Sequence, residues 1–159
     1  MASQHEYTVE IVWTGNRGTG TSDYRSYGRE LTVSAEGKSE IRGSADKTFH
    51  GDADRWNPEE LFLTALAQCH MLSYFHAAVK SGIVVTGYTD APSGTLTVNS
   101  DGSGRFSRVT LRPRVRLAAG TDEDAAADAH DEAHRLCFIA NSISVPIKIE
   151  PEFEWETAN

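Results

Sequence analysis

The sequence predicts a single α+β domain over residues 1–159, with the element order βββ-α-βββ-α-β. Three observations predict this class. Two groups of segments with alternating polar and apolar residues are typical of antiparallel β-meanders. Two long segments, which start near residues 57 and 121, have the apolar spacing of helices. A chain of 159 residues, 39% of them hydrophobic, also has enough apolar material for one core.

The first meander occupies the opening third of the chain. Residues 6–14 alternate as a half-buried strand does, and a glycine-rich turn follows them. The next strands are expected at 27–35 and 39–42, joined by a hairpin turn at 36–38.

The first helix is predicted to begin at Asn57-Pro58. Asn57 can cap the helix, Pro58 suits its first position, and Glu60 can close a capping box. The helix is expected to end at Gly82, which can adopt a positive φ, so its length is about 36 Å.

One apolar stripe is expected along this helix, because small and apolar residues recur at steps of three and four. Few polar residues remain for an outer face, so the helix is expected at the centre of the fold, shared with a second subunit of a homodimer. The stripe consists of Leu61, Ala65, Cys69, Leu72, His76 and Val79.

A second meander and a second helix are expected after residue 82. Strands are predicted at 83–90, 94–100 and 105–117, a helix from Thr121 to about Asn141, and a closing strand at 144–155. The apolar face of the helix contains Ala129, Ala133, Leu136, Cys137 and Ala140.

Composition excludes several classes of function. The chain has 15 Lys and Arg against 23 Asp and Glu, a net charge of −8, which disfavours binding to the nucleic-acid backbone. No run of about 18 apolar residues predicts a membrane span, and no signal peptide is recognisable, so a cytoplasmic location is expected. The two cysteines are too few for a disulfide scaffold, which makes redox chemistry the better explanation if both are functional.

The segment NPEELFLTALAQCH resembles the OsmC/Ohr family of thiol peroxidases. In that family a reactive cysteine follows the first Glu of the Asn-Pro-Glu motif by ten residues, which is the spacing of Glu59 and Cys69. The second family cysteine lies in the other long helix, as Cys137 does. The turn Thr14-Gly15-Asn16-Arg17-Gly18 resembles the turn that carries the catalytic arginine in one branch.

The resemblance implies an OsmC-like fold, an intertwined homodimer and reduction of organic hydroperoxides or hydrogen peroxide, in defence against oxidative stress. The reductant would be a dithiol or a lipoylated protein, and no cofactor or metal is expected. Cys69 would attack the peroxide and Cys137 would resolve the sulfenic acid as a disulfide. Arg17 would stabilise the thiolate, with Arg55 and Arg42 as weaker candidates, and Glu59 would hold the arginine.

Glu59 also has a purely structural interpretation, because acidic side chains are common at helix starts. Ten residues of continuous helix separate its Cα from that of Cys69 by about 15 Å. A shared site therefore requires either that the two residues pair across the dimer or that the helix begins later than Pro58.

A metal site is the main alternative interpretation. His130, His134 and Cys137 follow one another at helical spacing, so three possible ligands share a face, with Asp131 or Glu132 nearby. The two helical histidines near Cys69 suggest a different role. His76 is expected to be a hydrogen-bonded core residue on the apolar stripe, and either it or His70 is able to tune the thiol.

A second alternative is a protein of the same fold that binds an apolar ligand without catalysis. The pocket would lie among aromatic side chains at the subunit interface. These are Phe62, Tyr74, Phe75 and Phe138.

Overall fold

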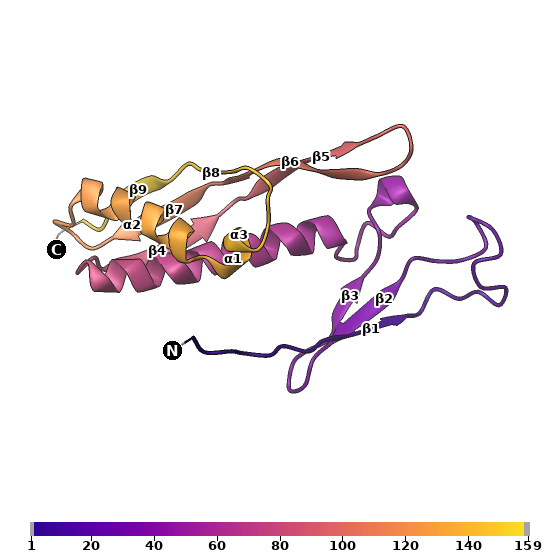
Figure 1. The fold of residues 1–159 in the computed structure, drawn as a ribbon. Coiled ribbons are helices and arrows are strands. Elements are labelled where there is room, and N and C mark those ends of the chain that lie inside the picture. The colour runs from indigo at the N-terminus through magenta and orange to yellow at the C-terminus, as the bar shows by residue number, and fades with distance from the viewer. Residues whose placement is uncertain (1, 158–159) are drawn as a thin grey trace. The chain divides into compact units, whose positions relative to one another are not determined.

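The computed structural model describes residues 2–157 and confirms the predicted α+β class (Figure 1). The chain divides into two compact units, residues 1–61 and residues 62–159. Within the described range, no helix has both the length and the apolar character needed to cross a lipid bilayer.

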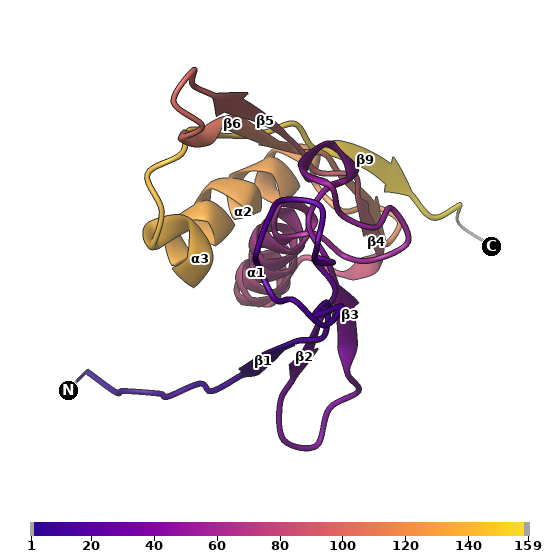
Figure 2. The same cartoon turned by 90° about the vertical axis from the view of Figure 1, so that its right-hand side faces the viewer.

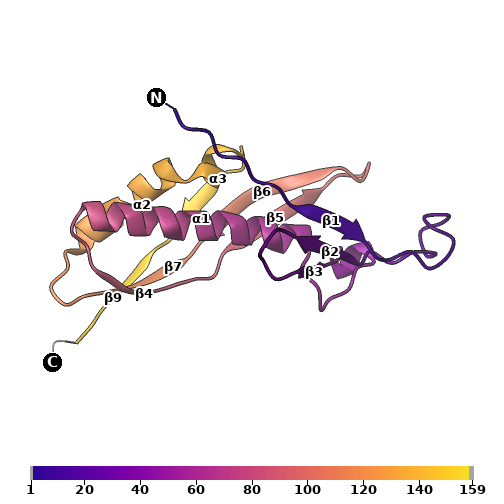
Figure 3. The ribbon, with the colours of Figure 1, turned by 90° about the horizontal axis from the view of Figure 1, so that it is seen from below.

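The first unit is built on the predicted antiparallel meander. Its strands are β1 (Glu10–Trp13), β2 (Leu31–Ser34) and β3 (Ile41–Gly43), in the order β1-β2-β3, followed by a 3₁₀ turn, η1 (Lys47–Phe49). Pairing of β1 and β2 continues beyond the strands as far as a bridge between Asn16 and Tyr27. The residues between form a loop that extends beyond the ends of both strands (Figure 3).

This three-stranded sheet leaves much of its apolar surface uncovered within the single chain. All four residues of β1 are exposed, and Ile11 retains 64% of its accessible surface. A small sheet needs a packed apolar face for stability, so the first unit requires cover that its own strands do not supply.

The second unit places its helices on one face of a layer of strands. Figure 2 shows α1 and α2 side by side on that face. The strands form two sheets, ordered β4-β7-β9 and β5-β6-β8, in which β8 and β9 pair in parallel with β6 and β7. The predicted second meander is therefore wrong in its pairing, because β4 pairs with β7 and β5 with β6. The elements are α1 (Pro58–Lys80), β4 (Val85–Asp90), β5 (Ser93–Val98), β6 (Gly104–Leu111), β7 (Pro113–Leu117), α2 (Glu123–Leu136), α3 (Phe138–Asn141), β8 (Ile147–Ile149) and β9 (Glu152–Trp155).

Three of the predicted elements are each divided in two. The strand expected at 105–117 breaks at Arg112, whose backbone N–H donates to Asp90 Oδ1 at 2.7 Å instead of joining a sheet ladder. The closing strand breaks before Pro151, which has no N–H to donate. The second helix breaks at Cys137, so that α2 and α3 replace one longer helix.

The boundaries of α1 follow the predicted signals. Asn57 Oδ1 accepts from Glu60 N at 2.8 Å, and Glu60 Oε2 accepts from Asn57 N at 3.3 Å, which completes the capping box. At the other end Gly82 has a φ of 69° and Ile83 N donates to Ala78 O at 2.9 Å, closing the last turn as a Schellman motif does.

The predicted apolar stripe of α1 is wrong, because the helix buries a different face. Leu72 and Val79 are 54% and 78% exposed, and His76 is exposed as well. Apolar residues surround this helix almost completely, so periodicity alone fits several faces. The residues buried along it are Leu66, His70, Tyr74, Ala77 and Ala78.

Two apolar clusters form the core of the second unit. One contains Tyr74 together with alanines of both helices and residues of β7. The other, which we call the cysteine cluster, is built from Leu66, Val109, Leu111 and Cys137, with Cys69 packed against it. The predicted apolar face of the second helix is confirmed at Ala129, Ala133 and Cys137, which are all buried.

Candidate functional site

The two cysteines lie next to each other in the cysteine cluster. α1 supplies Cys69, which is half-buried, and the end of α2 supplies Cys137, which is 0% exposed. Both are free thiols, and their side chains are close enough to hydrogen-bond. The fold therefore brings together two residues that lie 68 positions apart in the sequence.

Cys137 owes its position to the end of α2. Its backbone is extended, with φ −69° and ψ 110°, so it closes α2 and at the same time caps α3. Its Sγ accepts from Ala140 N at 3.4 Å, as a capping side chain does. The sequence predicted Cys137 inside a continuous helix, and this was wrong.

The environment of Cys137 keeps it protonated. Burial is the main cause that raises the pKa of its thiol, and with the smaller contribution of the neighbouring Cys69 thiol the pKa reaches about 11. The Ala140 N–H donor lowers the pKa but does not offset burial. A thiol of this kind is a poor first nucleophile at neutral pH, whereas Cys69 is the one that solvent reaches.

A pair of buried histidines joins the two helices that lead to the cysteines. His70 Nε2 and His130 Nδ1 are 2.9 Å apart, and the His130 ring stacks on Tyr74 with a centroid distance of 3.9 Å. Burial is the main cause that lowers the pKa of His70 to about 4 and that of His130 to about 3. The core histidine of α1 is thus His70, and the expectation for His76 was wrong.

The three side chains of the alternative metal site do not lie together. His130 points to His70, His134 is exposed, and Cys137 lies beyond the last helical residue of α2. Across residues 2–157 no group of three His, Cys, Asp or Glu side chains is placed to hold a metal ion.

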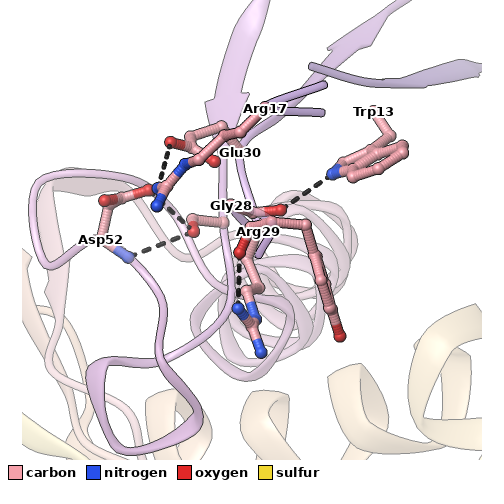
Figure 4. A network of polar contacts seen from close by, with 8 residues as sticks. Trp13, Arg17, Gly28, Arg29, Glu30 and Asp52 are labelled. Atoms are coloured by element: carbon pink, nitrogen blue, oxygen red, sulfur yellow. Dashed lines mark hydrogen bonds and ion pairs between the residues drawn. The ribbon is translucent and has the colours of Figure 1, made fainter. Parts of the chain in front are cut away.

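Arg17 is held in the loop between β1 and β2. Asn16 Oδ1 accepts from the backbone N–H groups of Gly18 and Gly20, at 2.9 and 3.1 Å, and so folds the chain tightly around Arg17. The Arg17 guanidinium turns back to Glu30, with Nη2 and Oε1 3.6 Å apart (Figure 4).

Two glycines make room for Glu30. A Cβ atom on Gly28 would lie 1.6 Å from Glu30 Oε2, and one on Gly15 would lie 2.7 Å from the same oxygen. Glu30 Oε2 is buried and lacks a hydrogen-bond partner among the described residues. Sequence reasoning missed Glu30, because the pairing that brings Glu30 and Arg17 together across the loop is not visible in residue spacing.

Glu59 lies in the first turn of α1, where it is half-buried. Its Oε2 atom is buried and has no hydrogen-bond partner within the described part of the chain. α1 is continuous from Pro58, so the alternative that the helix begins after Glu59 is excluded. Of the other arginine candidates, Arg42 is exposed on β3 and Arg55 is half-buried just before Trp56.

A groove borders the cysteine cluster in the second unit. Its volume is about 1250 Å³, and the rings of Phe62 and Phe106, which also pack against the cysteine cluster, stack in its wall at a centroid distance of 4.9 Å. Hydroxyl and amide groups and Arg105 complete the lining. Within this single chain the aromatic side chains expected to line an interface pocket do not lie together, because Tyr74 belongs to the other core cluster and Phe138 is 79% exposed.

Comparison with known proteins identifies the family. The family of OsmC-like proteins matches residues 51–152, which is more than half of the chain. An OsmC-like protein of Vibrio cholerae has a solved structure that is similar with a TM-score of 0.80 and 31% identity, covering 93% of this chain and 99% of that one. The chain belongs to the OsmC-like family.

A more distant solved structure has the same fold, and one further protein is similar in sequence. The organic hydroperoxide resistance protein of Elizabethkingia anophelis aligns with a TM-score of 0.68 and 19% identity, over 97% of this chain and 100% of its own. The protein YmaD of Bacillus subtilis (strain 168) is 24% identical over 155 residues, which cover 96% of this chain and 95% of YmaD.

Proposed function

We propose that this protein is a thiol-dependent peroxidase that reduces organic hydroperoxides or hydrogen peroxide. The observation that carries the proposal is the contact between a half-buried Cys69 and a buried Cys137 within the cysteine cluster. Relatives with the same fold include organic hydroperoxide resistance proteins, which supports peroxide as the substrate.

The reaction divides into two steps at the two thiols. The Cys69 thiolate attacks one peroxide oxygen, the O–O bond breaks, and the departing alkoxide takes up a proton, leaving Cys69 as a sulfenic acid. Cys137 then loses its proton, and its thiolate attacks the sulfenic sulfur. The departing hydroxide takes up a proton as water, and the Cys69–Cys137 disulfide forms. An external dithiol, such as a lipoylated protein, reduces the disulfide by exchange and becomes a disulfide itself.

A cation is needed to favour the Cys69 thiolate, and Arg17 is the candidate that we propose. Its guanidinium is held by Glu30 in a tightly folded loop, which leaves further N–H donors free to reach a thiolate or a peroxide oxygen. Glu59, with a buried oxygen that lacks a partner in the described chain, is proposed to help hold this arginine.

The proposed working unit is a homodimer, with Arg17 and Glu59 brought to Cys69 at a subunit interface. Exposed apolar side chains on β1 and on α1, such as Ile11, Leu72 and Val79, support this arrangement because a second copy would cover them.

The test is consumption of cumene hydroperoxide and hydrogen peroxide by the purified protein with excess dithiol. Cys69→Ser is expected to abolish consumption. Cys137→Ser is expected to retain one turnover and to leave a sulfenic acid at position 69 that dimedone traps. Unchanged consumption by Cys69→Ser, or none by the wild-type protein, would contradict the proposal.

Ligand binding without catalysis is the second candidate, and the groove beside Phe62 and Phe106 is the observation that favours it. Under this reading Cys69→Ser leaves binding of an apolar ligand intact while the wild-type protein consumes no peroxide. Titration with a hydrophobic fluorophore, in parallel with the peroxide assay, separates the two candidates.

A further inference from the structure

The buried histidine pair connects the two helices that carry the thiols. His70 lies on α1 and is 1% exposed, and His130 lies on α2 and is 2% exposed. Their ring nitrogens are 2.9 Å apart, and the outer nitrogens, His70 Nδ1 and His130 Nε2, are buried without partners among the described residues. Two polar rings are therefore kept in the core for one mutual hydrogen bond, at a considerable cost in desolvation.

Most of the apolar residues that these two helices bury against each other are alanines. Both helices present these small side chains to the same apolar cluster, and small side chains form lower ridges to interlock in the grooves of a packed helix than long ones do. A further hydrogen bond joins α1 to α2, from Tyr74 Oη to Ala126 O at 3.2 Å. These alanines are Ala77, Ala78, Ala126, Ala129 and Ala133.

The hydrogen bond of the histidine pair is the nearer of the two to the thiols. His70 directly follows Cys69, and His130 precedes Cys137 by seven residues, about two helical turns. Tyr74 and Ala126 lie further from the cysteines on both helices. A disulfide needs Cα atoms within about 7 Å, whereas a slip of one helical turn moves a residue by about 5.4 Å. A small change in the register of α2 on α1 therefore separates the two sulfur atoms.

We propose that His70 and His130 are positioning residues, which set the register of α2 on α1 so that Cys137 faces Cys69 for disulfide formation. The inference deepens the proposed function, because it concerns its resolving step. The experiment that tests it uses no peroxide, so its outcome does not depend on whether the protein reduces peroxides.

The experiment measures how readily the Cys69–Cys137 disulfide forms in equilibrium with reduced and oxidised glutathione. The equilibrium constant gives the effective concentration of one thiol toward the other. His70→Leu removes the hydrogen bond and leaves His130 buried alone, so this concentration is expected to fall about tenfold. His70→Gln, whose amide reaches the place of the ring Nε2, is expected to restore it to within about twofold of the wild type.

Tyr74→Phe is the matched control, since it removes another buried hydrogen bond between the helices but lies further from the thiols. It is expected to change the effective concentration by less than about twofold, because the bond it removes is not next to either cysteine in the sequence. Equal losses in Tyr74→Phe and His70→Leu would overturn the proposal, because they would show a general effect of helix docking. No loss in His70→Leu, or no disulfide in the wild type, would overturn it too.

A variant that fails to fold does not decide the question, so a second substitution is included. His130→Asn keeps a polar atom near the place of Nδ1, and His130→Leu does not. The proposal requires the asparagine variant to form the disulfide more readily than the leucine variant. The same value for the two, with circular dichroism showing that both are folded, would count against it.

Discussion

Acid is expected to destabilise this protein through the buried histidine pair. In the unfolded chain a histidine has its ordinary pKa of 6.5, whereas burial lowers the pKa of His70 to about 4 and that of His130 to about 3 in the folded chain. Between these values the unfolded chain binds more protons than the folded one, so unfolding becomes easier as the pH falls. The contribution of the neutral pair to the unfolding free energy is fully present above about pH 6.5. It is lost as the pH falls toward the pKa values of the folded chain.

The size of the effect follows from the pKa values. The difference between 6.5 and about 4 for His70 corresponds to about 3 kcal/mol of unfolding free energy, and His130 contributes at least as much. The value for His70 includes a smaller lowering of the pKa by the nearby charge of the exposed His134. On the other side of the pair, Tyr74 stacks on His130 as a neutral ring. The unfolding free energy is therefore expected to fall by more than about 3 kcal/mol between about pH 7 and about pH 4.

Urea unfolding followed by far-UV circular dichroism at a series of pH values measures this loss. The matched variant carries both His70→Gln and His130→Asn, which keep hydrogen-bonding groups but do not titrate in this range. Subtracting its pH dependence removes the contribution of carboxylates. Parallel curves for the wild type and the variant would refute the reasoning, and so would ring titrations by NMR that place both histidines near 6.5.

Three further outcomes are expected. The step from sulfenic acid to disulfide should accelerate about tenfold per pH unit through neutral pH. The reason is that the pKa of Cys137 is about 11 and only its thiolate attacks. A rate that does not change with pH in stopped-flow measurements would argue against this. Glu30→Gln should lower kcat/KM for peroxide. It should change the unfolding free energy by less than about 1 kcal/mol, because the ion pair of Glu30 with Arg17 is partly exposed. An unchanged kcat/KM would show that Glu30 does not belong to the site. Leu66→Ala, at the centre of the cysteine cluster, should cost about 3 kcal/mol in urea unfolding, and a loss below about 1 kcal/mol would contradict the described packing.

Local signals in the sequence were sufficient to predict where α1 starts and ends. The capping box of Asn57 and Glu60 and the positive φ of Gly82 depend on residues within one turn, and both form as predicted. The first meander was predictable for the same reason, since strand alternation and glycine-containing turns are local patterns. The same patterns located the strands after residue 82 but not their pairing, because β4 pairs with β7 rather than with β5.

Features that depend on tertiary packing were not predictable from the sequence. The buried face of α1 is decided by the strands and α2 that cover it, and apolar residues on most of the helix circumference hide that choice. Cys137 ends α2 because its extended backbone turns the chain and its thiol caps α3, and helical spacing carries no sign of this.

The candidate site was predictable in part. The spacing of Glu59 and Cys69 suggested the reactive thiol, and the structure places Cys137 beside it. The partners of the buried histidine and of Arg17 come from distant segments, which spacing along one helix or turn does not reveal. His130 illustrates the point, because its position on α2 suggested a metal ligand while its contact is with α1.

A single-turnover reaction tests the central proposal most directly. The reduced protein is mixed with one equivalent of cumene hydroperoxide, and the remaining thiols, the peroxide and the linked peptides are measured by thiol titration and mass spectrometry. The proposal predicts one peroxide consumed for two thiols lost, with a disulfide joining Cys69 and Cys137. Unconsumed peroxide with both thiols still free would contradict it.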